Sequence, residues 1–409
     1  MENFYSFTAL RGIQGRRMSY IIQIPLSMVG TLFEQENFSL PVIERKQRTL
    51  NKARVNQIAK YLVDNPDSYV LPPLVAQIIG DVEQTPDQLH RDIVTLKIKM
   101  GSKLQLLDGQ HRCAGIQMAL QQRKYLGDEV IQVKILTCGN LADSQQVFAD
   151  ININAVKPPQ SIKMLYNHRD DLTSFSKALI EQIPVFKNHT DFERTNLPPQ
   201  SDNIFTFSAI YQANKELLKS SSDEAMLDLK TLIQFWNTVA LVMTEWDGQK
   251  NAGELREQSI SVHAVTLSAL AEVGRTLIEK YPSEWPELLN GLVGVDWSRS
   301  NPDWKDRTVV TGKITKSRKN IQLTANKILQ YLGVELNKDQ KNLETEFLKN
   351  IIDKNRKYRK SKIEDIAKHT VGLSSFDVKK IVFYEYEFMN KKKELLYKLK
   401  KDLYKNIVK

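Results

Sequence analysis

Hydrophobic residues in the first 150 positions follow short patterns that switch between strand and helix periodicity. Residues 94–98 alternate apolar and polar, which predicts a half-buried strand, and LQLL and VIQVKIL predict two further strands. NKARVNQIAKYL carries apolar residues at helical spacing and predicts a helix that ends near Asn65. Only a short turn at 100–103 separates the strand at 94–98 from LQLL, so we expect these two strands to form a hairpin.

From Leu141 onward, helical periodicity dominates and strand signals almost vanish. Long apolar-periodic segments lie around 203–219, 225–245 and 260–280, and NIQLTANKILQYLG predicts a final core helix with Gly333 as its C-cap. The predicted fold class is therefore α+β. We expect a mixed domain over residues 1–150, a mainly α-helical domain over 151–337 and a basic helical extension over 338–409.

The net charge of +10 favours a polyanionic partner, and it is unevenly distributed. Residues 339–409 hold 19 Lys or Arg against 11 Asp or Glu, a net charge of +8, which leaves +2 for the preceding 338 residues. A solvated, lysine-rich helical surface explains this excess as well as a DNA-facing tail does.

The extension also carries a pattern typical of two helices joined at Gly372. Lys379 and Lys380 would lie early in the second helix, as in a helix-turn-helix, although an ordinary αα-hairpin is an alternative. The basic helix predicted after it begins with Lys391, Lys392 and Lys393. These five lysines are the candidate DNA-binding residues.

Composition excludes several classes of protein. Two cysteines and six histidines, none at finger-like spacing, predict neither a disulfide framework nor a zinc site, so we expect no metal centre and a reducing compartment. No apolar run reaches the length of a spanning helix, and the first residues lack a secretory h-region. A soluble cytoplasmic protein is expected. No Walker A loop, dinucleotide fingerprint or nucleophile triad is present.

The segment LQLLDGQHRCAGIQ predicts a strand, a tight Asp-Gly turn and a helix start. Such a turn directs free backbone N–H groups and the positive end of a helix dipole at one spot, which favours phosphate. Gly109 permits close backbone approach, Arg112 can clamp a phosphate, and Gln110 and His111 add polar contacts. Asp108 can hold a metal or orient a water, and His111 can act as a general base.

An ordinary structural interpretation competes at every position of this turn. Asp108 can be the N-cap of the helix, Gly109 a simple turn residue, and Arg112 a surface residue that pairs with a nearby carboxylate.

The DGQHR pentapeptide resembles the signature of the DndB family of DNA phosphorothioate modification systems. Further blocks resemble the same family in order: FTALRGIQGRR, ERKQRTLNKARVNQIAKYL with YVLPPLVAQIIG, QVFADININAVKPPQSIKMLYNHRDDL, and LTANKILQYLG. The resemblance spans roughly residues 4–335.

The resemblance implies a ParB/sulfiredoxin-like N-terminal fold and a DNA-binding transcriptional repressor of its own modification gene cluster. Asp108, Gln110, His111 and Arg112 would form the phosphate-facing turn, with Gln47 and Arg48 in the same cleft. The expected phosphate-binding residues are Gln47, Arg48, Gly109, Gln110 and Arg112. The alternative is a nucleotide hydrolase (an ATPase or other NTPase) or a DNA nickase that uses Asp108, His111 and Arg112. The sequence identifies no cofactor, and a nucleoside triphosphate with Mg²⁺ is the candidate. Expected partners are promoter DNA, other phosphorothioation proteins and, for a symmetric operator, a second copy of the chain.

Overall fold

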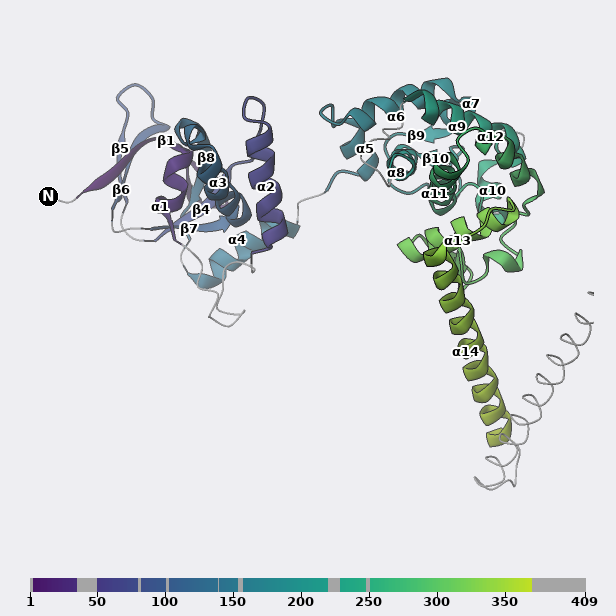
Figure 1. The fold of residues 1–409 in the computed structure, drawn as a ribbon. Coiled ribbons are helices and arrows are strands. Elements are labelled where there is room, and N and C mark those ends of the chain that lie inside the picture. The colour runs from purple at the N-terminus through teal and green to yellow at the C-terminus, as the bar shows by residue number, and fades with distance from the viewer. Residues whose placement is uncertain are drawn as a thin grey trace, which may run out of the picture. The chain divides into compact units, whose positions relative to one another are not determined.

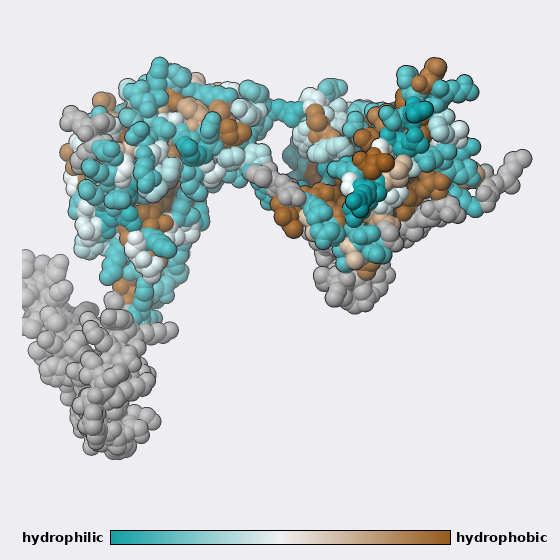
Figure 2. Space-filling model, turned by 180° about the vertical axis from the view of Figure 1, so that it is seen from behind, coloured by the Kyte–Doolittle hydropathy of each residue, from teal (hydrophilic) through white to brown (hydrophobic). Residues whose placement is uncertain are grey.

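The computed structural model describes residues 3–34, 50–79, 82–100, 103–138, 140–153, 157–219, 229–247 and 251–369. The chain divides into two compact units, Met1–Lys157 and Pro158–Lys409, each with its own hydrophobic core (Figure 1). Hydrophilic residues make up most of the surface of each unit that Figure 2 displays, as expected where apolar side chains fill the interior. Within the described ranges, every helix is too short or too polar to cross a membrane.

A mixed eight-stranded sheet forms the centre of the N-terminal unit, with the order β3-β7-β4-β8-β2-β1-β6-β5 among the described residues. Its strands are β1 (Phe4–Gln14), β2 (Arg17–Pro25), β3 (Phe33–Glu34), β4 (Leu74–Ile79), β5 (Val82–Pro86), β6 (Ile93–Lys99), β7 (Lys103–Asp108) and β8 (Val130–Leu136). The strands predicted from LQLL, VIQVKIL and residues 94–98 are therefore present.

The predicted hairpin between β6 and β7 is wrong. β6 pairs with β1 and β5, whereas β7 pairs with β3 and β4. In a flat sheet, β6 and β7 would lie five strand spacings apart, which is about 24 Å. The four residues from Lys99 to Lys103 can span at most about 14 Å. The sheet is therefore strongly curved. β1 contributes to this curvature because it pairs with β6 over its first half and with β2 over its second.

Helices cover both faces of this sheet. α1 (Val29–Leu32), α2 (Lys52–Asp64) and α3 (Gln110–Gln122) share the larger core with the strands, together with the short 3-10 helices η1 (Leu26–Met28) and η3 (Lys124–Asp128). α4 (Leu141–Ile153) packs on the opposite face, where Val147 meets Leu107 and Leu136. Ser144 Oγ of α4 also donates a hydrogen bond of 2.6 Å to Gln77 Oε1 of β4.

The second unit is almost entirely helical, and its two described pairs of strands have only two residues in each strand. α11 packs against both α8 and α13, and Phe186, Trp236 and Trp304 are fully buried. The predicted α+β class is confirmed. The helices are α5 (Gln160–Leu165), α6 (Asp171–Gln182), α7 (Pro184–His189), α8 (Phe207–Leu217), α9 (Leu229–Val242), α10 (Ala252–Gln258), α11 (Ala264–Lys280), α12 (Trp285–Leu288), α13 (Arg318–Tyr331) and α14 (Lys338–His369), with 3-10 helices η4 (Thr244–Trp246), η5 (Leu289–Gly294) and η6 (Pro302–Trp304); the strand pairs are β9 (Thr190–Asp191) with β10 (Phe205–Thr206), and β11 (Val309–Val310) with β12 (Lys313–Ile314).

Gly333 ends α13 as predicted. Its φ of +70° lies in the left-handed region, and its N–H donates to Gln330 O over 3.1 Å, while Val334 N–H donates to Leu329 O over 2.9 Å. These two bonds form a Schellman motif, in which glycine adopts the positive φ without a steric penalty.

α14 begins soon after this cap and runs as a continuous helix of 32 residues. Its first half is attached to the helical unit by a buried ion pair, because Arg307 Nη1 and Nη2 lie 2.7 Å and 2.6 Å from the two carboxylate oxygens of Glu344. The Phe347 ring is buried below the Arg307 guanidinium, at 4.3 Å from its centroid. The predicted break at Gly372, and the helix after it, lie outside the described residues.

Candidate phosphate-binding turn

The turn between β7 and α3 requires glycine at position 109. Gly109 is the N-cap of α3 and has a φ of +106°. A Cβ atom there would lie 2.5 Å from Leu74 Cδ2 and 3.0 Å from Arg112 Nη2. Arg112 therefore folds its guanidinium back over the turn, next to the first N–H groups of α3, which have no partner within the helix.

Asp108 and Arg112 form an ion pair across this turn. Asp108 is the last residue of β7, so Gly109 takes the N-cap position that the structural interpretation gave to Asp108. The pairing of Arg112 with a carboxylate, which the same interpretation expected, is confirmed. The Asp108 side chain is 34% exposed and that of Arg112 is 16% exposed. A ligand arriving from solvent can therefore reach the carboxylate, and it would compete with that carboxylate for the guanidinium.

His111 is buried and connects α3 to α2. Its Nε2 accepts a hydrogen bond of 2.9 Å from the backbone N–H of Asn51. A backbone N–H can only donate, so Nε2 is unprotonated in this arrangement. Asn51 is itself the N-cap of α2, and its Oδ1 accepts from Arg54 N–H at 3.2 Å. Asn51 is not among the residues predicted from the sequence, although an Asn directly before a helical pattern is an N-cap signal.

The two helices run in the same direction from this contact. A Cβ on Gly115 would lie 2.5 Å from Ile58 Cγ2, so α2 and α3 approach closely one or two turns beyond their N-termini. The N-terminal ends of both helices are thereby held together beside Arg112. The positive ends of two helix dipoles and one guanidinium thus act on the same region, which is an arrangement that favours an anion.

Other predicted groups at the turn have clear positions. Gln110 is the first residue of α3 and is half-buried. Cys113 is buried, and desolvation raises the pKa of its thiol to about 12, so it is a packing residue rather than a nucleophile. The described residues contain no group of three or more His, Cys, Asp or Glu side chains that could hold a metal ion. Gln47, Arg48 and the five candidate lysines Lys379, Lys380, Lys391, Lys392 and Lys393 lie outside the described residues.

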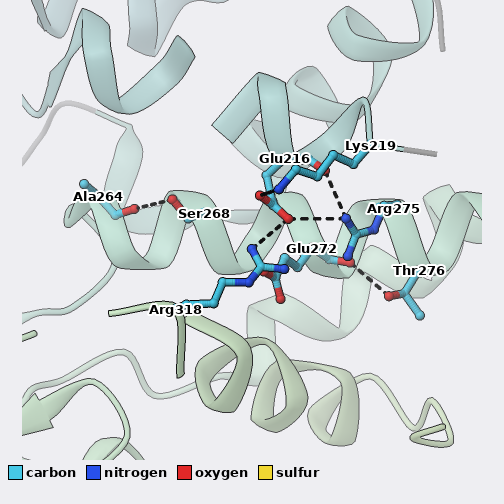
Figure 3. A network of polar contacts seen from close by, with 8 residues as sticks. All are labelled: Glu216, Lys219, Ala264, Ser268, Glu272, Arg275, Thr276 and Arg318. Atoms are coloured by element: carbon cyan, nitrogen blue, oxygen red, sulfur yellow. Dashed lines mark hydrogen bonds and ion pairs between the residues drawn. The ribbon is translucent and has the colours of Figure 1, made fainter. Parts of the chain in front are cut away.

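A second charged cluster lies inside the helical unit and was not predicted. Figure 3 shows Glu216 of α8 between three cationic side chains, those of Lys219, Arg275 and Arg318. The distances from the Glu216 carboxylate oxygens to their side-chain nitrogens are 2.7 Å, 3.3 Å and 2.8 Å, in that order. Arg318, the first residue of α13, also lies 2.7 Å from Glu272 of α11, without the alignment of a hydrogen bond. The cluster therefore joins three helices.

The two buried carboxylates of this cluster have opposite pKa shifts. Burial opposes the ionisation of Glu216, but hydrogen bonds from Lys219 and Arg318 prevail and lower its pKa. Burial raises the pKa of Glu272, and the charge of Arg318 offsets this only in part. Since each cation in Figure 3 lies against a carboxylate of the same chain, we interpret the cluster as structural.

Comparison with known proteins agrees with the resemblance carried by the DGQHR motif. The family model DndB, described as DNA-sulfur modification-associated, matches residues 7–335. No curated protein and no solved structure matches the chain, so the ParB/sulfiredoxin-like fold remains a prediction. The match includes the turn at 108–112 and ends just before α14. Because it covers most of the sequence, the chain belongs to the DndB family of DNA-sulfur modification-associated proteins.

Proposed function

We propose that this protein is a DNA-binding transcriptional repressor of a DNA phosphorothioate modification gene cluster, with a phosphate- or nucleotide-binding site at the 108–112 turn. The observation that carries the proposal is the convergence of the N-termini of α2 and α3 beside Arg112. Membership of a DNA-sulfur modification-associated family supplies the biological setting. Other phosphorothioation proteins and a second copy of the chain are the expected protein partners.

The ion pair between Asp108 and Arg112 gives the site a means of responding to its ligand. In this structure, the carboxylate of Asp108 neutralises the guanidinium of Arg112. A phosphate with two or more oxygens can accept from Arg112 and from the first N–H groups of α3 at once, whereas Asp108 is fixed at the end of β7. Binding of phosphate would therefore separate Arg112 from Asp108 and change the start of α3.

Through His111, the start of α3 is connected to the start of α2. A shift of α3 on phosphate binding would therefore reach Asn51 and the chain that precedes α2. The predicted ligand residues Gln47 and Arg48 belong to that preceding segment. In this proposal, nucleotide binding at the turn regulates the affinity of the protein for its promoter.

Enzymatic activity is less well supported than binding. A general base must present a free lone pair to its substrate. The Nε2 lone pair of His111 is used by Asn51 in a buried contact, which supports a positioning role for this histidine. The nucleotide hydrolase or DNA nickase, with Mg²⁺ as cofactor, is therefore the second candidate. Turnover that is abolished by both Asp108→Ala and Arg112→Ala in a folded protein would favour it.

DNA binding is tested by titrating the full chain with a fragment from upstream of its own gene cluster, over a series of salt concentrations, with and without nucleotide. We expect the upstream fragment to bind more tightly than an unrelated duplex of equal length, with a nucleotide-dependent affinity. Equal affinity for the two duplexes at every salt concentration would contradict the repressor assignment.

Two substitutions with opposite expected effects on phosphate affinity test the phosphate site. Asp108→Asn removes the competing charge and frees Arg112, so affinity for nucleotide or inorganic phosphate should rise. Arg112→Gln removes the clamp, so affinity should fall by about tenfold or more, the loss of one charge-assisted contact. Lys60→Gln is the matched control, because Lys60 forms an exposed ion pair of the same spacing with Asp64 in α2. Equal affinities for all three variants, measured by calorimetry, would exclude the turn as the site.

A further inference from the structure

The distribution of charge along α14 differs sharply between the part attached to the helical unit and the part beyond it. The attached part, residues 338–353, has a net charge of −1 and includes the buried Glu344 and Phe347. Residues 354–362, which we name the basic arm, have the sequence KNRKYRKSK, with six Lys or Arg and no acidic residue. Residues 363–369 return to a net charge of −1.

The described attachment of α14 to the rest of the helical unit includes Lys354, the first residue of the basic arm. Lys354 Nζ lies 2.8 Å from Asp306 Oδ1. Figure 1 shows α14 running away from α13. At a rise of 1.5 Å per residue, the helix continues for about 22 Å beyond Lys354.

Two features of the arm favour a partner that carries many negative charges. Several pairs, such as Arg356 with Lys360 and Lys357 with Lys360, have like charges at i,i+4 or i,i+3 spacing, which destabilises an isolated helix. At 100° per residue, the six basic positions are distributed around the whole helix axis rather than along one stripe. A partner that surrounds the helix matches this distribution better than a flat anionic surface does.

We propose that the basic arm of α14 lies in the major groove of double-stranded DNA and neutralises phosphates on both sides of it. The major groove is about 12 Å wide and admits one α-helix between two phosphate backbones. The arm lies outside the region matched by the family model, so this contact belongs to the C-terminal extension of this chain. This inference rests on the proposed DNA-binding function, and it assigns the electrostatic contact to the arm instead of to the five lysines predicted from the sequence.

Two variants of equal charge change test the assignment in the full chain. The arm variant replaces Arg356, Lys357, Arg359, Lys360 and Lys362 by Gln, and it keeps the ion pair of Lys354. The tail variant, which is the matched control, replaces the five candidate lysines by Gln: Lys379, Lys380, Lys391, Lys392 and Lys393. Gln has a helix propensity close to that of Lys and Arg, so helicity should be preserved, as circular dichroism can verify.

Affinity for a DNA duplex is then measured against salt concentration for all three proteins. Each phosphate contact contributes about 0.9 to the slope of log affinity against log salt, so the arm variant should lose a slope of about 3 to 5. The tail variant should lose less than about 1. An unchanged slope in the arm variant, or equal losses in both variants, would overturn the inference.

Two further outcomes separate this inference from the proposed function. If the wild type binds upstream and unrelated duplexes equally and only the arm variant loses slope, the arm is supported and the repressor assignment fails. If the wild type prefers the upstream fragment and the arm variant keeps its slope, the repressor assignment stands and the arm fails. Duplex RNA should compete poorly, because its major groove is too narrow for a helix. Competition by RNA as strong as that by DNA would overturn the groove contact.

Discussion

The ion pair between Arg307 and Glu344 provides the sharpest test of how α14 is attached. Both residues are only 8% exposed, and their two hydrogen bonds measure 2.7 Å and 2.6 Å. Asn326 Nδ2 also donates to Glu344 Oε1 over 3.2 Å, so the carboxylate is well satisfied. The substitution Glu344→Gln keeps the shape of this side chain and removes its charge, which leaves Arg307 buried without a counter-ion.

Removing one partner of a buried ion pair costs about 3 to 5 kcal/mol. For a unit of this size, about 2 to 4 °C of melting temperature corresponds to each kcal/mol, so Glu344→Gln should lower the melting temperature by about 6 to 20 °C. Release of α14 would hydrate Arg307 again, but it would also expose Phe347, whose burial contributes about 2 to 3 kcal/mol. If α14 is released, the fall in melting temperature should therefore be smaller than this range, and proteolysis of α14 should be faster than in the wild type.

Thermal unfolding by calorimetry, combined with limited proteolysis, measures both effects. Glu346→Gln is the matched control, since Glu346 lies on the same part of α14, forms an exposed pair with Lys319 of α13 and should be replaceable without measurable change. The double substitution Arg307→Met with Glu344→Leu should recover most of the lost stability, because no charge remains buried. If Glu344→Gln matched the control in melting temperature and in proteolysis, the attachment of α14 through this pair would be refuted.

Three further predictions concern the turn, the charged cluster and the buried thiol. Gly109→Ala should lower the free energy of unfolding by about 2 to 4 kcal/mol, because it adds both backbone strain and a steric clash. Gly15 also has a positive φ, +57°, but a Cβ there would meet no atom closer than 3.9 Å. Gly15→Ala should therefore cost only about 1 kcal/mol, as measured by urea denaturation. Because the pKa of Glu216 is lowered, its carboxylate stabilises the fold above the ordinary pKa of 4.5, and this stability is lost as pH falls through the lowered value. The pKa of Glu272 is raised, so its ionised form is destabilising above that raised value. At pH 7, Glu216→Gln should therefore lower the melting temperature and Glu272→Gln should raise it, with both differences shrinking as pH falls toward 3; shifts of the same sign would contradict the pKa directions. Cys113, with a pKa of about 12, should resist alkylation at pH 8 in the native protein and react at once in guanidinium, and rapid native labelling detected by mass spectrometry would show that its burial is wrong.

Much of the secondary structure and part of the turn could be predicted because local rules decide them. Helical periodicity predicted α2 and α3, alternation predicted β6, and the position of Gly333 predicted the end of α13. The tight turn at Gly109 followed from an Asp-Gly pair between a strand and a helix. In each case a few neighbouring residues set the backbone conformation, so no distant contact had to be known.

The tertiary structure decided which of these elements meet. Alternation in β6 identifies the side chains that enter the core, but it is equally compatible with β7 or β1 as the neighbouring strand, because either strand satisfies the same backbone hydrogen bonds. The contact of His111 with Asn51 joins residues that are 60 positions apart. Folding brought the starts of two helices together at the 108–112 turn and buried Arg307 against Glu344. The sequence by itself determined the local chemistry and the strongly basic extension, whereas long-range packing determined which charges are neutralised within the chain.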